Sequence, residues 1–140
     1  MEFESLQDGI DLAIRNALHQ LGCCASKWVL VAETVVVADS SGQGLWCVAS
    51  KNAKPWDTYG MLTCQDSWLP TEGVASEIQN VFRDQERSLT TKMIVVVEVI
   101  RDGLRELRSD ATRDMRPWDV AGLLRFALEE EAAHHNMHRE

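Results

Sequence analysis

The sequence lacks any apolar run long enough to cross a bilayer. Its longest runs, at residues 35–38 and 93–97, fall far short of the roughly 20 residues that a transmembrane helix needs. The first twenty residues contain four acidic side chains, and they offer neither the basic start nor the uninterrupted apolar stretch of a signal peptide. We therefore expect a cytoplasmic protein with no membrane partner.

An excess of basic residues is also missing. Fourteen Lys and Arg stand against 22 Asp and Glu, which gives a net charge of −8. A general binder of the nucleic-acid backbone needs the opposite balance, so we expect no nucleic-acid partner.

Motifs of catalysis and cofactor binding are equally scarce. The chain has no Gly-rich phosphate loop, no G-x-S-x-G elbow and no Cys/His pairing with a recognisable signature. Cys23 and Cys24 lack the spacer of a zinc knuckle, and His134 and His138, with Glu131 and His135, lie at chelating spacing only at a helix end where histidines usually fray into solvent. We identify no catalytic residue and expect no metal, no cofactor and no enzyme.

What the chain does contain is an internal repeat. Residues 54–62 recur at 116–124 with Pro, Trp, Asp, Gly and the final Leu unchanged, at an offset of 62. Upstream, residues 27–33 align with 92–98 at an offset of 65, and residues 45–50 align with 104–109 at an offset of 59. Each unit thus repeats the same order of segments, with turns of different length between them.

The secondary structure of each unit follows from its apolar pattern. Residues 28–38 and 93–100 are apolar at odd and even positions alike, which indicates central strands covered on both faces. Asp102-Gly103 is typical of a tight hairpin, which returns through the shorter strand 104–109 as 45–50 does in the first unit, and we expect both return strands at sheet edges.

Helices flank these hairpins. An amphipathic helix spans residues 3–21 and stops at Gly22, a second begins near Thr71, and Pro55 and Pro117 open the helix that closes each unit. The predicted fold is α+β: a tandem αββα repeat with pseudo-twofold symmetry, units 1–69 and 70–140 fused into one body. Its antiparallel hairpins form either one mainly antiparallel sheet or two apposed hairpins.

The two Trp-Asp pairs, Trp56-Asp57 and Trp118-Asp119, allow two interpretations. They could form a duplicated ligand or partner surface, an aromatic anchor beside a carboxylate, to which Trp46 is a further candidate. They could instead be structural, with Pro and Asp starting a helix and Trp packing on the sheet. We expect the structural role, in which replacing either Trp by Ala costs roughly 3 to 5 kcal/mol.

Gly60 and Gly122 lie inside the closing helices, where glycine is unfavourable by roughly 1 kcal/mol relative to alanine. We expect them at helix contacts too tight for a Cβ atom, including a contact of one with the other at the pseudo-twofold axis.

Glu33 and Glu98 occupy matching positions in otherwise apolar strands. One hypothesis is a paired-carboxylate site across the axis, suited to acid–base chemistry or a metal. The alternatives are an exposed position or a salt bridge to Lys27, Lys92 or an arginine.

The residues 27–33, Leu45-Trp46 and 55–62, and their second copy from 94–98 through 117–124, resemble a domain of small uncharacterised proteins of actinobacteriophages, mycobacteriophages in particular. The resemblance implies a small cytoplasmic protein made in a bacterial host, and it implies no activity. This chain departs from the usual form by carrying two copies.

The function that we expect is that of a non-enzymatic interaction protein, phage-encoded, which engages a host protein or forms a homo-oligomer through exposed apolar surface. The alternative is a small-ligand binder or enzyme that uses a cleft between the repeats, with Glu33 and Glu98 as its groups.

Overall fold

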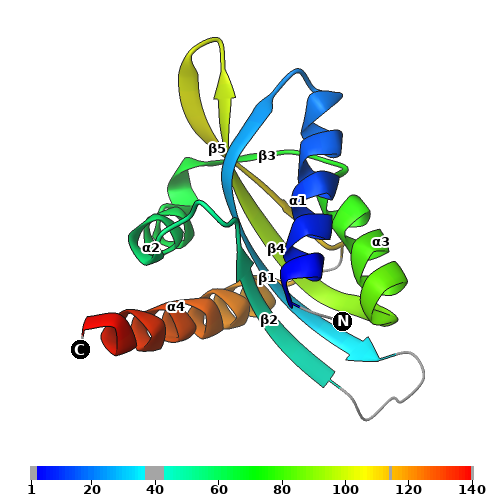
Figure 1. The fold of residues 1–140 in the computed structure, drawn as a ribbon, viewed down its shortest axis with the longest axis vertical. Coiled ribbons are helices and arrows are strands. Elements are labelled where there is room, and N and C mark those ends of the chain that lie inside the picture. The colour runs from blue at the N-terminus through cyan, green and yellow to red at the C-terminus, as the bar shows by residue number, and fades with distance from the viewer. Residues whose placement is uncertain (1–2, 37–42, 114, 140) are drawn as a thin grey trace.

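The computed structural model describes the backbone of residues 3–36, 43–113 and 115–139, and the side chains of 6–35, 44–113 and 115–130. The fold is α+β: a five-stranded mixed sheet flanked by four helices (Figure 1). In chain order the elements are α1 (Phe3–His19), β1 (Cys24–Val36), β2 (Gln43–Ala49), α2 (Pro55–Thr63), the 3₁₀ turn η1 (Gln65–Ser67), β3 (Trp68–Pro70), α3 (Val74–Glu86), β4 (Ser88–Arg101), β5 (Leu104–Ala111) and α4 (Pro117–Arg139).

The strands lie in the order β2-β1-β4-β5-β3. The pairs β2–β1, β1–β4 and β4–β5 are antiparallel, and β1 and β4 form the long central pair. The structure therefore contains one sheet and not two apposed hairpins. It is mixed, because β3 pairs in parallel with β5.

The two return strands differ in their surroundings. Strand β2 lies at the edge of the sheet, as predicted. Strand β5 does not, since β3 covers it at Leu107–Ser109. The same pairing explains why α3 begins at Val74 and not near Thr71: residues 68–70 are extended along β5, and Gly73 turns the chain with a φ of 89° before the helix starts.

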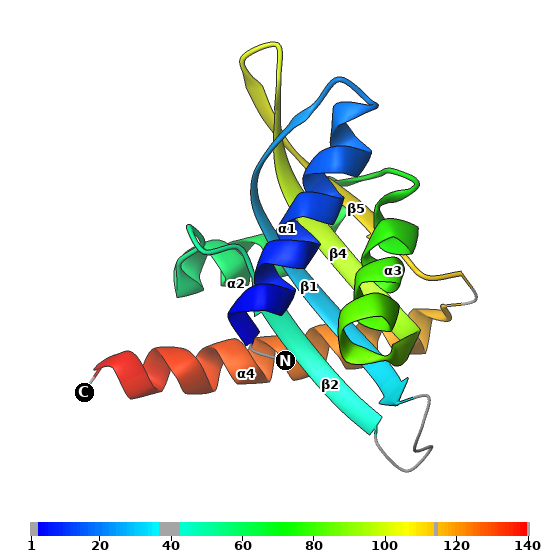
Figure 2. The ribbon, with the colours of Figure 1, turned by 45° about the vertical axis from the view of Figure 1, so that its right-hand side comes forward.

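Helices cover both faces of the sheet. Figures 1 and 2 show α1 and α3 together on one face and α2 and α4 on the other. The side chains of β1 alternate between the two cores: Leu30 and Ala32 pack with α1 and α3, and Val29 and Val31 pack with α2 and α4. The prediction of central strands buried on both faces is confirmed.

The predicted turns form for the expected reasons. Gly22 follows α1 with a φ of 75°, and its N–H donates to the His19 carbonyl at 3.0 Å. Asp102 and Gly103 both have a positive φ, 53° and 78°. A two-residue hairpin turn needs positive φ at both positions to match the twist of its strands. Within the described residues, no helix is long and apolar enough to cross a membrane.

Candidate functional site

Helix α2 is tied to strand β1 through Asp57. The Asp57 carboxylate accepts the backbone N–H of Lys54 at 3.0 Å, which caps the helix, and it binds the Lys27 ammonium at 3.0 Å. The Lys54 N–H and, after it, the Lys27 ammonium lower the pKa of Asp57 below its ordinary value. The carboxylate therefore stays ionised and fixes the rotation of the helix about its own axis.

Helix α4 repeats this arrangement on strand β4. The Asp119 carboxylate accepts the backbone N–H of Arg116 at 3.0 Å and binds the Lys92 ammonium at 2.8 Å. The Lys92 ammonium and, after it, the Arg116 N–H lower the pKa of Asp119, and Asp119 in turn raises the pKa of Lys92. Lys27 and Lys92 are aligned residues of the sequence repeat, so the same three groups start the closing helix of each half.

The tryptophans beside these aspartates face solvent. Trp56 is 67% exposed and Trp118 is 70% exposed, so the prediction that both pack against their hairpins is wrong. The reason is the rotation of each helix. Asp57 and Asp119 each bind a lysine of the sheet, so their side of the helix faces the sheet. The tryptophan before each aspartate lies about 100° away around the helix and therefore points outward. Tyr59, three residues after Trp56, is 53% exposed.

The glycines of these helices are also unconstrained. A Cβ atom added to Gly60 or Gly122 would meet nothing within 4 Å in the described part of the chain, so the predicted tight contacts are wrong. The close approach of two helices occurs at Gly9 of α1 instead. A Cβ atom there would lie 3.1 Å from Cγ1 of Val81 and would press on the side chain of Gln85, both in α3.

Glu33 and Glu98 lie at opposite ends of the central strand pair. The register places Glu33 opposite Lys92 and Glu98 opposite Lys27. These two pairs are six residue steps apart along β1, which corresponds to roughly 20 Å. Glu33 accepts a hydrogen bond from the Thr91 hydroxyl at 2.7 Å, and Glu98 forms an ion pair with Arg105 at 3.3 Å. The structure thus does not bring the two carboxylates together.

Trp46 is a half-buried residue of the α1–α3 core. Its indole Nε1 donates to the Thr34 hydroxyl at 2.9 Å, and its ring meets Phe82 edge-on with centroids 5.7 Å apart. These contacts give Trp46 a structural role and leave Trp56 and Trp118 as the exposed members of the candidate set.

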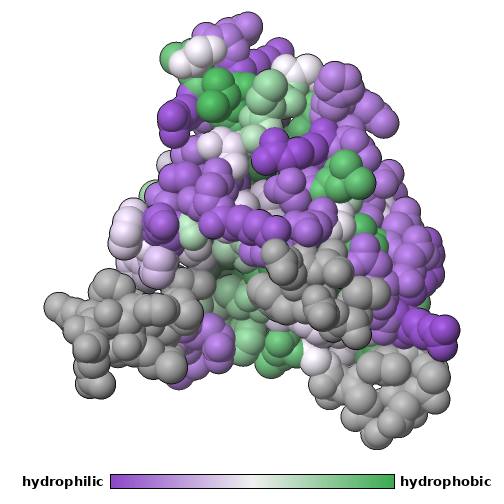
Figure 3. Space-filling model, in the orientation of Figure 1, coloured by the Kyte–Doolittle hydropathy of each residue, from purple (hydrophilic) through white to green (hydrophobic). Residues whose placement is uncertain are grey.

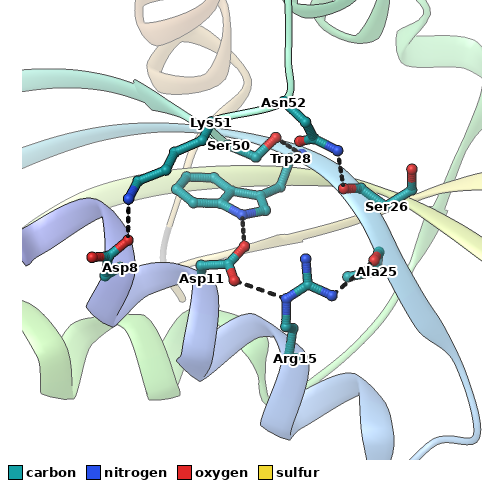
Figure 4. Close-up of polar contacts among 9 residues, drawn as sticks. All are labelled: Asp8, Asp11, Arg15, Ala25, Ser26, Trp28, Ser50, Lys51 and Asn52. Carbon is teal, nitrogen blue, oxygen red and sulfur yellow. Dashed lines mark hydrogen bonds and ion pairs between the residues drawn. The ribbon is translucent and has the colours of Figure 1, made fainter. Parts of the chain in front are cut away.

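A polar network that the sequence does not reveal surrounds Trp28 (Figure 4). Trp28 is fully buried, and its indole N–H donates to Asp11 of α1 at 2.8 Å. The other oxygen of Asp11 binds Arg15 at 2.8 Å, and Arg15 reaches the Ala25 carbonyl at 3.1 Å. Asp11 lies on the polar face of α1, where a solvent-facing aspartate gives the same sequence pattern, so no local signal distinguishes it.

Potential metal ligands do not gather in the described residues, where no group of three or more His, Cys, Asp or Glu side chains could hold an ion. The four cysteines are unbridged. The side chains of the His-rich C-terminal segment lie outside the described residues, so the absence of a metal there stays a prediction.

The face seen in Figure 3 is mostly hydrophilic, and hydrophobic residues gather near the β4–β5 hairpin at the top and in the lower centre of the view. No family model, curated protein or solved structure matches this chain.

Proposed function

We propose that this protein is a non-enzymatic interaction protein that binds a partner protein through two equivalent aromatic surfaces, one on α2 and one on α4. The observation that carries the proposal is the exposure of Trp56 and Trp118 at matching positions of the two halves. Tryptophan is the residue most enriched among those that dominate binding energy at protein interfaces.

Each tryptophan lies in the first turn of a helix, and this turn is anchored to the sheet. The aspartate that follows it is held by a lysine of the sheet and by the helix cap, so the first turn of the helix has little freedom. A large aromatic side chain presented by a fixed backbone loses little conformational entropy on binding and can bury roughly 150–250 Å². These properties suit a contact residue better than a core residue.

The repeated geometry also supports the origin that we propose, a duplicated αββα unit with pseudo-twofold symmetry. Under that symmetry the two helix starts lie at opposite ends of the central strand pair, roughly 20 Å apart, as the positions of Lys27 and Lys92 indicate. Two such surfaces suit a partner that carries the same feature twice, or two copies of one partner.

We assign the partner to a bacterial host protein, in keeping with a phage-encoded protein of the cytoplasm. The net charge of −8 opposes binding to a nucleic-acid backbone. A homo-oligomer through the same tryptophans is the other outcome that the experiment distinguishes.

The experiment compares the tagged wild type with Trp56→Ala and Trp118→Ala. Leu104→Ala is the matched control, because Leu104 is an equally exposed apolar residue, 71% accessible, on the distant β4–β5 hairpin. Proteins captured from an actinobacterial lysate are purified, and their affinity for each variant is measured by calorimetry. We expect a purified partner whose affinity falls in both tryptophan variants and not in Leu104→Ala.

Sedimentation velocity of the wild type and the variants tests the other outcome. If the wild type self-associates and either tryptophan variant is monomeric, the partner is a second copy of this chain and not a host protein. The proposal is overturned if the wild type is monomeric and its captured partners bind both tryptophan variants with the wild-type affinity.

A further inference from the structure

We infer a small-molecule site on the face of the sheet that α1 and α3 cover, in a cavity between α3, the start of β4 and the end of β5. The site takes a zwitterion of the amino-acid class. The cavity has a volume of about 650 Å³, within the range of ligand sites. We call it the α3 cavity. Its polar lining includes Glu72, Ser76, Gln79, Thr90, Asp110 and Arg113. It does not depend on the tryptophan surfaces, because α3 and α2 cover opposite faces of the sheet.

The first observation is that a carboxylate of the protein already binds the N-terminal end of α3 in this cavity. One oxygen of Asp110 accepts the backbone N–H of Ala75, in the first turn of α3, at 2.7 Å, and the other accepts the N–H of Ala111 at 2.9 Å. The positive end of the helix dipole is therefore matched by a carboxylate. A phosphate or sulfate would meet this fixed negative charge, so the cavity disfavours a plain anion.

The second observation is that three polar residues of the lining lack a partner within the described part of the protein. Glu72 and Arg113 are exposed residues that line the cavity, and neither forms an ion pair in the described part of the chain. The Thr90 hydroxyl is buried and has no hydrogen-bond partner among the described residues. Such a buried group is unfavourable, and a bond from a ligand would satisfy it once the Thr90 side chain rotates toward the cavity.

The third observation comes from the corresponding place in the first half. The offset of 64 that aligns Ile14 with Ile78 places Asp11 at Ala75 and Arg15 at Gln79. In the first half, the ion pair of Asp11 with Arg15 and that of Asp8 with Lys51, 2.9 Å long, cross this place and leave a cavity of only about 300 Å³ (Figure 4). In the second half, Ala75 and Gln79 form no such pair, and the space stays open.

The chemistry of the open cavity selects the ligand. A guanidinium on one segment and a carboxylate on another, Arg113 and Glu72, can bind the carboxylate and the ammonium of one small molecule. The Gln79 amide and the Thr90 hydroxyl add donors and acceptors for the rest of it. No aromatic side chain is among the described residues that line the cavity, so a stacked ring is not what we expect it to recognise.

The test is a titration of the ¹⁵N-labelled full chain with each of the twenty L-amino acids and with glycylglycine, followed by amide chemical shifts. We expect saturable shifts at residues 72–79 and 110–113 with at least one of these compounds. Arg113→Ala and Glu72→Gln each weaken that affinity by about tenfold or more, since each removes a charge-assisted contact.

Arg15→Ala and Asp8→Asn, at the corresponding place of the first half, are the matched controls and leave the affinity unchanged. Trp56→Ala also leaves it unchanged, which separates this site from the partner surface. The inference is overturned if no compound shifts these amides, if the shifts survive both Arg113→Ala and Glu72→Gln, or if inorganic phosphate alone produces them. Thermal melting of each variant confirms that the fold is intact.

Discussion

Leu30 of β1 lies directly opposite Val95 of β4 in the middle of the sheet, and these two residues are also aligned by the sequence repeat at its offset of 65. The residues before and after Leu30 pair with the residues after and before Val95. Exchanging the two halves therefore leaves the pairing unchanged around this point. A twofold axis between Leu30 and Val95 would produce this register, which supports the proposed duplication.

The exposure of the repeated tryptophans leads to a stability prediction. Trp56→Ala and Trp118→Ala should each change the free energy of unfolding by less than about 1 kcal/mol, since neither ring packs in a core. Trp28→Ala, at a fully buried position, should lower it by about 3–5 kcal/mol. Urea unfolding followed by circular dichroism measures all three. A loss at Trp118 as large as that at Trp28 would contradict the exposed placement.

The open space around two helical glycines predicts stabilising substitutions. Gly60→Ala and Gly122→Ala should each raise the free energy of unfolding by about 0.5–1 kcal/mol, because alanine is the better helix former and its Cβ atom meets nothing. Gly9→Ala in α1 is the control and should gain less, since its Cβ atom would press on Val81 and Gln85. Calorimetric melting temperatures compare the three, and equal gains at all positions would contradict the close contact at Gly9.

The network around Trp28 predicts a cost for losing one carboxylate. Asp11→Ala leaves the buried indole N–H without its acceptor and should lower the free energy of unfolding by about 1–3 kcal/mol. Arg15→Ala removes only the half-exposed outer partner and should have a smaller effect. Urea unfolding at one pH measures both variants. A larger loss of stability in Arg15→Ala than in Asp11→Ala would show that the hydrogen bond from the Trp28 indole to Asp11 is not the main contribution.

The lowered pKa values of Asp57 and Asp119 predict how stability depends on pH. A carboxylate whose folded-state pKa lies below its unfolded value, about 3.9, stabilises the fold above that value, and the contribution disappears as pH falls through the folded-state pKa. Asp57→Asn and Asp119→Asn should thus be less stable than the wild type near neutral pH and converge with it in strong acid.

The measurement is urea unfolding at a series of pH values from neutral to strongly acidic. Asp84→Asn is the control, because Asp84 is highly exposed and lies 4.0 Å from its nearest cation, Arg83. Its difference from the wild type should stay small throughout. A constant difference between wild type and Asp119→Asn over the whole series would show that the ionised carboxylate contributes nothing.

Features encoded in neighbouring residues could be predicted from the sequence. The apolar runs predict β1 and β4, Asp102-Gly103 predicts their hairpin, and the Pro-Trp-Asp segments predict the starts of α2 and α4. Strand β3 was not predicted, because its three residues carry no local strand pattern. They are extended only because they pair with β5, some forty residues later in the chain.

The errors at the candidate site have the same origin. Which way Trp56 points depends on the ion pair between Lys27 and Asp57, thirty residues apart. The separation of Glu33 from Glu98 depends on the register of β1 against β4. Both are long-range relationships, and no spacing within one segment contains them. The α3 cavity, likewise, arises only when three distant segments come together.

The central pairing of β1 with β4 has a consequence for synthesis of the protein on the ribosome. Leu30 and Val95 are 65 positions apart, so β1 emerges long before the strand that covers its inner edge. Until then, a strand that is apolar on both faces has an unpaired row of backbone groups, the usual template for aggregation. A chain that stops after residue 69 should therefore precipitate or associate with its own copies through β1, and only translation of the second half ends this exposure.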